Sequence, residues 1–535
     1  MADWKTIGEQ KRQSVQEKIP KEWRLQASTL ADAHAASDLD VTSIPRECGI
    51  LTADEVIITE SYDATDLLAK LAAGEYSATA VTTAFCKRAA IAQQLTSCLT
   101  EIFFDEALER AAFLDDYLAT NDKPLGPLHG LPISIKDSFN YIGQDTTLGF
   151  VSFVGKSTAT HHSALVRMLL DLGAVLYIKS NVPQTLMTAD SENHVFGRTL
   201  NPHRLTLTAG GSSGGEGAIV GMRAALLGVG TDIGGSIRVP AMCCGTFGFR
   251  PSASRIPYGE QSTPGRVGSP GVLAAAGPLT TSARDLSLFM KIVLNQQPWQ
   301  YDHSVYHVAW RPVAEKKTLR VGLLPLDPAF PVHPPMKRAL QSAIDRLKDV
   351  NGIELVPLEY VPSIAVANRQ IADYYSLDPD ITPFKNIEAS GEPKIRSVAE
   401  SPFVSQRNGR LIMDDLYTLN ANRAQAMAEW HKNVWIAKNL DALLGPVAET
   451  TAMPHDTFGN TPYTTLYNYL DYPSVVIPHG KADKAVDVGE GFVSYKGYNA
   501  EKTHGAPTAI QLAARPLFDE ELLAAAEKIA AILKV

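Results

Sequence analysis

The centre of the chain reads Gly228-Val229-Gly230-Thr231-Asp232-Ile233-Gly234-Gly235-Ser236-Ile237-Arg238-Val239-Pro240. The two adjacent glycines leave the backbone free to bring successive N–H groups towards one point. Such a turn can bind an oxyanion, and Ser236 would sit against it. A glycine–serine turn is structural far more often than catalytic, so other parts of the chain have to support a catalytic interpretation.

A second glycine–serine cluster lies one apolar helix upstream and reads Gly210-Gly211-Ser212-Ser213-Gly214-Gly215-Glu216. It contains the G-x-S-x-G pattern of a nucleophile elbow, which would make Ser213 the nucleophile of a Ser–His–Asp esterase. Ser213 and Glu216 also have the spacing of a helix capping box, and we favour this interpretation. Ser212 then lies just outside the helix, beside its positive end.

Lys136 is the third element, at the end of an apolar strand predicted over residues 131–136. A lysine at a strand end is normally a solvated group. If it is buried, loss of hydration lowers its pKa and makes the neutral amine a base. A serine nucleophile needs such a base, and lysine can replace histidine in this role.

Helical patterns alternate with short apolar strands along the chain, which predicts an α/β layer fold. We expect helices over residues 106–118, 163–172, 282–294 and 520–535, and strands over 131–136, 174–178, 441–446 and 474–478. Residues 1–60 form a polar, charged helical arm on the surface. Residues 61–535 form one compact domain, in which 296–440 are less regular and tolerate insertions.

The composition is that of an ordinary soluble globular protein, with 535 residues, 45% hydrophobic and 20% charged. A net charge of -9 argues against nucleic acid or an anionic membrane as the partner. The chain contains no secretory signal and no apolar run of about eighteen residues, so we predict a cytoplasmic protein without a membrane span. Its five cysteines lack a C-x-x-C pair, which favours reduced thiols.

No cofactor or metal is predicted. A segment resembling a Walker A loop near Gly149 has the wrong glycine spacing, and so does the glycine pattern from Gly228 to Gly234 as a dinucleotide fingerprint. The thirteen histidines include no H-E-x-x-H motif.

Together, the two glycine–serine clusters and the segment 126–137 resemble the amidase signature hydrolases. The stretch from Gly228 to Pro240 is most similar to fungal acetamidases and general amidases, with fatty acid amide hydrolases as more distant relatives. Family-like matches cover more than half of the chain and make residues 61–535 the amidase signature domain. The resemblance implies a mixed central sheet covered by helices on both faces.

The resemblance also implies a Ser–Ser–Lys triad and the residues around it. Ser236 would be the nucleophile, Ser212 the bridging serine after a cis peptide bond, and Lys136 the general base. The implied oxyanion hole is formed by N–H groups of Ile233, Gly234, Gly235 and Ser236, and the implied substrate-side residues are Leu186 in the acyl pocket and Thr231 and Asp232 at the turn.

The sequence therefore predicts a hydrolase of carboxylic amides that works through an acyl-enzyme. Short aliphatic amides such as acetamide are the expected substrates, with ammonia as a product. Carbamates, esters and fatty acid amides are alternative substrates on the same fold, and a non-catalytic subunit of the transamidation type is an alternative from another class. The expected partner is a small-molecule amide, and self-association is left open.

Overall fold

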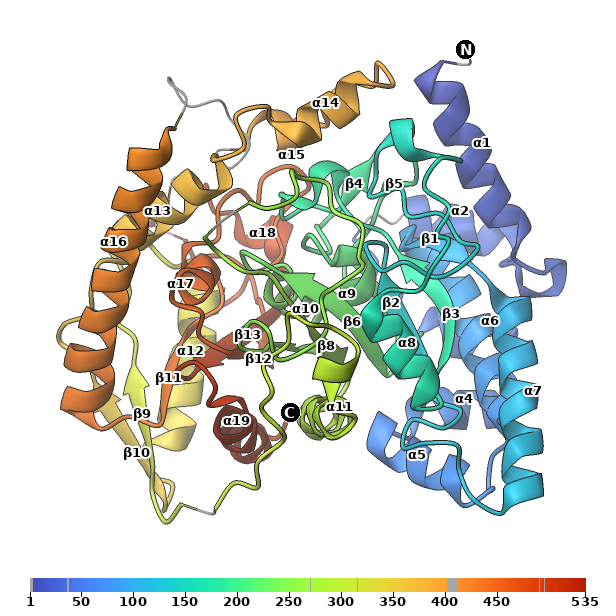
Figure 1. Cartoon of the computed structure of the whole chain (residues 1–535), viewed down its shortest axis with the longest axis horizontal. Coiled ribbons are helices and arrows are strands. Elements are labelled where there is room, and N and C mark those ends of the chain that lie inside the picture. Colours follow the sequence, from blue (N-terminus) through green and yellow to red (C-terminus); the bar gives the residue numbers. More distant parts are fainter. Residues whose placement is uncertain are drawn as a thin grey trace.

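The computed structural model describes residues 3–35, 38–269, 271–314, 316–401, 411–489, 491–494 and 496–535. Within these ranges, eleven strands form one sheet in the order β1-β3-β2-β6-β8-β7-β12-β13-β11-β9-β10 (Figure 1). Its strands are β1 (Leu99–Ile102), β2 (Pro132–Lys136), β3 (Val175–Ser180), β6 (Leu227–Asp232), β7 (Phe247–Arg250), β8 (Ala275–Thr280), β9 (Leu319–Leu323), β10 (Ile353–Pro357), β11 (Ala442–Pro446), β12 (Ser474–Lys481) and β13 (Pro507–Ala513). Strands β4 (Glu192–Asn193) and β5 (Gly197–Arg198) form a separate hairpin.

The sheet is mixed, as predicted. Strand β2 runs parallel to β3 and β6, and β9 runs parallel to β10 and β11, whereas the other neighbours are antiparallel. Strands β1 and β10 are its two edges, so residues 99–102 and 353–357 lie on opposite sides of the molecule (Figure 1).

Helices cover both faces of this sheet. The α-helices are α1 (Trp4–Glu17), α2 (Ala27–Ala35), α3 (Ile44–Glu47), α4 (Ala53–Glu60), α5 (Ala64–Ala72), α6 (Ala78–Thr96), α7 (Phe104–Asn121), α8 (Ala164–Asp171), α9 (Gly214–Gly221), α10 (Arg238–Cys244), α11 (Ala283–Asn295), α12 (Pro334–Leu347), α13 (Ile364–Tyr375), α14 (Thr382–Glu388), α15 (Arg396–Ala399), α16 (Met413–Glu429), α17 (Pro462–Leu470), α18 (Ala500–Thr503) and α19 (Asp519–Leu533). A π-helix, η5 (Trp430–Ile436), continues α16, and four short 3₁₀ helices are η1 (Lys21–Trp23), η2 (Val151–Phe153), η3 (Gln184–Leu186) and η4 (Pro298–Gln300). None of the helices in the described part of the chain is long and apolar enough to cross a membrane.

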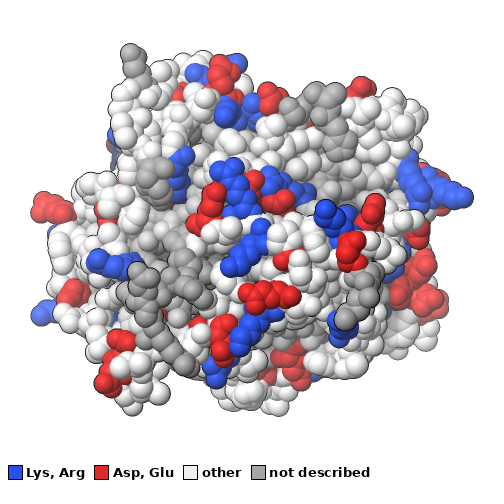
Figure 2. Space-filling model, turned by 90° about the horizontal axis from the view of Figure 1, so that it is seen from above, with Lys and Arg blue, Asp and Glu red and all other residues white. Residues whose placement is uncertain are grey.

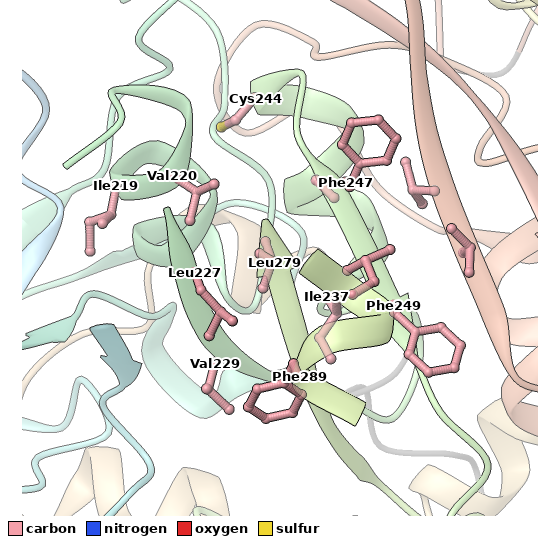
Figure 3. Packing of buried hydrophobic residues seen from close by; sticks show 14 of the residues in the cluster. Ile219, Val220, Leu227, Val229, Ile237, Cys244, Phe247, Phe249, Leu279 and Phe289 are labelled. Atoms are coloured by element: carbon pink, nitrogen blue, oxygen red, sulfur yellow. The ribbon is translucent and has the colours of Figure 1, made fainter. Parts of the chain in front are cut away.

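Strand β6 shows how the sequence builds the two faces. Alternate residues of a strand point to opposite faces. Leu227 and Val229 lie in the apolar core together with Phe289 of α11 (Figure 3). On the other face, a Cβ atom at Gly230 would lie 2.8 Å from the hydroxyl of Ser213, so only glycine leaves room for the chain that enters α9. The glycines of β6 therefore allow close packing at the centre of the sheet.

Two expectations about regular structure were wrong. The apolar segment between the glycine clusters was expected to be helical; α9 confirms the helix as far as Gly221, but the segment ends in the strand β6. Residues 296–440 were expected to be less regular, yet they contribute β9 and β10 to the sheet and helices α12 to α16. Residues 315 and 402–410 of that region lie outside the described residues.

The N-terminal arm packs on the surface beside β1. Val15 and Ile19 are buried. Lys11 forms ion pairs with Glu101 at 2.5 Å and Asp145 at 3.1 Å. Glu101 is almost fully buried, and burial raises its pKa although the charge of Lys11 opposes this. The arm therefore supplies a cation that a core carboxylate needs.

We expect Lys11→Ala to lower the free energy of unfolding by about 2 kcal/mol or more, because Glu101 then stays buried without its nearest cation. Denaturant-induced unfolding measures the loss. Lys21→Ala removes an exposed lysine of the same arm and is expected to change stability by about 0.5 kcal/mol at most. Equal effects of the two substitutions would contradict a structural role of the arm.

Candidate active site

The loop that follows β6 is organised by one carboxylate. Asp232 accepts hydrogen bonds from the N–H groups of Gly235 at 2.8 Å and Ile237 at 3.1 Å. Arg238 donates to both carboxylate oxygens at 3.0 Å. Asn468 of α17 donates a further bond at 2.8 Å. The loop is therefore folded around Asp232 and is tied to an element far along the chain.

Burial alone would raise the pKa of Asp232, but the charge and hydrogen bonds of Arg238 hold that pKa well below its usual range. The carboxylate stays ionised and is fully occupied by donors from the protein. It does not line the cavity described below. Asp232 therefore supports the turn, as the resemblance implied, whereas its position gives no support for a contact with substrate.

Lys136 lies at the end of β2 and is fully buried. Its Nζ donates to Ser212 Oγ at 2.7 Å and to Thr231 Oγ1 at 2.9 Å. Burial lowers the pKa of Lys136 to about 7, although the negative charges of Asp232 and nearby carboxyl groups oppose the shift. Near neutral pH a substantial share of the amine is therefore uncharged, as a general base requires.

Ser212 is nearly buried, and the peptide bond between Gly211 and Ser212 is cis, which confirms the arrangement that the resemblance implied. The neighbouring Ser213 does not cap α9 with its side chain, so the predicted capping box was wrong. The Ser213 hydroxyl instead lies 3.4 Å from both the N–H and the C=O of Thr231, and Glu216 accepts a hydrogen bond from Ser134. Packing against the glycines of β6 takes both side chains inward.

Ser236 opens onto a cavity of about 490 Å³. Gly211, Ile233 and Gly234 line the same cavity beside it. Ser213 is not among the lining residues, which argues against a nucleophile elbow at that position. The Ser236 hydroxyl makes no hydrogen bond to another described residue. The structure therefore joins Lys136 to Ser212 and places Ser236 at the cavity next to Gly211, without a bond between the two serine hydroxyls.

Three backbone N–H groups at this wall of the cavity have no partner among the described residues: those of Ile233, Gly234 and Ser236. Successive backbone N–H groups of one loop that lack a partner can bind a negatively charged oxygen. The N–H of Gly235, which was expected to join them, donates to Asp232 instead. This corrects the predicted oxyanion hole, because the tight turn directs that N–H into the loop.

Two further expected residues lie on different sides of the site. Leu186 lines the cavity with a positive φ of 59°, in line with the acyl-pocket position that the resemblance implied. Thr231 does not line the cavity and is bonded to Lys136. It holds the lysine, and the expectation that it contacts substrate has no support in its position.

Sequence reasoning missed the residues that reach the loop from the later part of the chain. The hydroxyl of Tyr375, in α13, donates to the carbonyl of Ile233 at 2.5 Å and lines the cavity. Thr461 and Thr464, at the start of α17, donate to the carbonyl of Gly234 at 3.1 and 2.9 Å. No local motif marks these side chains, because their role arises only when distant segments meet.

The site thus combines a buried amine, two serine hydroxyls and N–H donors beside a cavity. An acyl-transfer enzyme needs these groups as base, nucleophile and oxyanion donors. No group of three or more His, Cys, Asp or Glu side chains in the described ranges is arranged to hold a metal ion.

Comparison with known proteins agrees with this class. The Amidase family model matches residues 80–523. An amidase from Gibberella moniliformis is 41% identical over 534 residues, covering 99% of both chains. An acetamidase from Emericella nidulans is 38% identical over 550 residues, covering 99% of this chain and 98% of the relative. The chain therefore belongs to the amidase family and is an amide-hydrolysing enzyme.

Solved structures give the same result for the fold. A fatty acid amide hydrolase superposes with a TM-score of 0.93 at 33% identity, covering 99% of this chain and 95% of that one. A bacterial aryl acylamidase has a TM-score of 0.70 at 20% identity and covers 88% of this chain and 96% of that one. The mixed sheet with helices on both faces is thus the amidase signature fold.

We expect Gly235→Ala to lower stability by about 2 kcal/mol or more and to remove most of the activity. Its φ is +119°, and a Cβ atom would lie 2.3 Å from Thr464 Oγ1. The matched variant is Gly234→Ala, whose nearest neighbour, Tyr375 Oη, is 3.1 Å from the new Cβ atom. Thermal unfolding compares the two, and an equal loss of stability would contradict the strained-turn argument.

Proposed function

We propose that this enzyme hydrolyses carboxylic amides through an acyl-enzyme on Ser236, with Ser212 and Lys136 as the proton relay. The observation that carries the proposal is the fully buried Lys136, bonded to Ser212 at 2.7 Å and with a pKa lowered by burial to about 7. Within the described ranges Lys136 forms no ion pair with an acidic side chain, and such a buried amine is suited to accept a proton rather than to balance a charge.

The steps follow from the donors and acceptors in place. Neutral Lys136 takes the proton of Ser212 as Ser212 takes that of Ser236, and Ser236 Oγ attacks the carbonyl carbon. The contact between the two serines forms on substrate binding, as catalytic hydrogen bonds often tighten only in the complex. The free N–H groups hold the oxyanion. The proton returns through Ser212 to the leaving nitrogen, and water then cleaves the ester.

Short aliphatic amides such as acetamide are the proposed substrates, with ammonia released. Support comes from the relatives named acetamidase in Emericella nidulans and Aspergillus oryzae. The apolar side chains of Leu186, Met187 and Val239 line the cavity and suit an alkyl group. A second candidate is a larger acyl or aryl amide, because about 490 Å³ lies in the range of cavities that hold drug-sized ligands.

The proposed partner is a small molecule in the cytoplasm rather than nucleic acid or a membrane. Supporting this, acidic and basic side chains alternate in small groups on the face seen in Figure 2, without a large basic field. Carbamates and esters stay alternative substrates, since the same attack serves any accessible acyl carbon. The non-catalytic alternative is tested by the labelling experiment below.

We expect Ser236→Ala to lower kcat on the order of a thousandfold or more and to abolish covalent labelling by a fluorophosphonate. Ser213→Ala is the matched control in the adjacent cluster and should keep labelling and most of the activity. Lys136→Ala should lose most of its turnover. If Ser213→Ala were inactive and Lys136→Ala active, the esterase mechanism would replace the triad. Absence of labelling in the unmodified enzyme would favour the non-catalytic subunit.

Ammonia release from a series of primary amides, from acetamide to long-chain and aromatic acyl amides, tests the substrate range. A kcat/KM that peaks at short chains is the expected result, because Leu186, Met187 and Val239 line the same cavity as Ser236 and suit a small alkyl group. Ser236→Ala provides the blank. A peak at long or aromatic acyl groups would favour the second candidate, with residues 296–440 shaping the cavity.

A further inference from the structure

Glu216 is a fully buried carboxyl group that the proposed mechanism does not use. Its Oε2 accepts a hydrogen bond from Ser134 Oγ at 2.5 Å. Its other oxygen, Oε1, makes no hydrogen bond of regular geometry in the described part of the chain, although the Ser180 hydroxyl lies near enough to the carboxyl group to lower its pKa. A buried acidic group with such an oxygen is unusual enough to require an explanation.

The position of Glu216 follows from the sheet. Ser134 and Lys136 are two residues apart on β2 and therefore lie on the same face. Ser134 pairs with Gly228 of β6, and a Cβ atom at Gly228 would lie 2.1 Å from Glu216 Oε2. The carboxyl group thus occupies a space that only glycine leaves open. Glu216 thus contacts β2 at Ser134, two residues before Lys136.

Three acidic groups act on Lys136: Asp232 from β6, Asp137 from the end of β2 and Glu216 from α9. Asp232 is paired with Arg238 at 3.0 Å. Asp137 lies 3.5 Å from the Nζ of Lys179.

Glu216 differs because no ion pair satisfies it in the described part of the chain. Burial raises the pKa of Glu216 to about 7, while the hydroxyls of Ser134 and Ser180 and the charge of Lys136 lower it. The charges of Glu216 and Lys136 are therefore coupled to each other. Cys98 and Tyr177 also face Glu216, and burial holds the pKa of each thiol or phenol high enough to keep it neutral.

We propose that Glu216 is a positioning residue that acts electrostatically on Lys136, keeping its amine basic enough to draw a proton from Ser212. This inference rests on the proposed function of Lys136. The negative form of Glu216 stabilises the ammonium form of the lysine, so it sets both the pH at which the base becomes available and the strength of that base. A weaker base accepts the proton of Ser212 less readily.

The test is Glu216→Gln, which keeps the shape and removes the charge. In a pH profile of kcat/KM for an amide substrate, the acidic limb should move to lower pH by about one unit. The plateau should fall several-fold, because Lys136 becomes a weaker base. Glu392→Gln is the matched control: Glu392 is a buried glutamate whose pKa burial also raises to about 7, and it bonds Gln184 and Val151 instead. Its acidic limb should stay in place.

Ser134→Ala provides a second variant if Glu216→Gln does not fold. It removes the hydroxyl that favours the ionised carboxylate, so the acidic limb should move in the same direction by a smaller amount. If a folded variant keeps the acidic limb of the unmodified enzyme and Lys136→Ala is inactive, the inference about Glu216 is wrong. Full activity of Lys136→Ala would instead overturn the proposed function itself, so the two failures are distinguishable.

Discussion

The buried ion pair between Asp232 and Arg238 is the interaction on which the site depends. Asp232 ends the central strand β6, and its carboxylate gathers the N–H groups of the loop that follows. Arg238 also donates to the carbonyl of Thr464 at 3.0 Å and to Gln511 Oε1 at 2.9 Å. One guanidinium thus links β6, α17 and β13. Neither charge is solvated, so each is stable in the core only because the other is present.

Opposing effects set the pKa of the buried Lys136 amine near this loop. The lysine loses its hydration, which weakens its hold on the proton, and the neighbouring carboxyl groups restore part of that hold. The balance depends on glycines at 228 and 230 of β6, which let polar side chains from α9 pack directly on the sheet. Larger residues at these positions would separate the helix from the strand and change the distances that determine the balance.

The sequence identified the candidate site residues better than the elements that pack around them. Lys136, Ser212 and Ser236 were selected through the resemblance of their three segments to the amidase signature, because each of these turns alone is more often structural than catalytic. The strand β6 was not among the predicted strands. Its Leu227, Val229 and Thr231 alternate with Gly228 and Gly230, and glycines in a strand weaken the pattern because they add no side chain that packs. Its glycines are explained only by the helix that packs on them.

The misassigned donors have a similar cause. The direction of the Gly235 N–H depends on Asp232, and the inward position of Glu216 depends on Ser134. Local spacing, such as that of the expected capping box, contains no information about a strand from another part of the chain. Tyr375 is the clearest example, because its hydroxyl reaches the loop from a helix in the region that appeared least regular.

The cavity is built from two separate sources. The wall with Ser236 belongs to the central loop, whereas Tyr375, Arg396 and Glu400 come from a region whose strands form the far edge of the sheet. Tyr375 joins the two sources, because its hydroxyl donates to the carbonyl of Ile233 in the central loop. For enzyme engineering, this makes residues 376–401 the natural place to diversify a library, with Tyr375 and the loop between β6 and α10 kept constant.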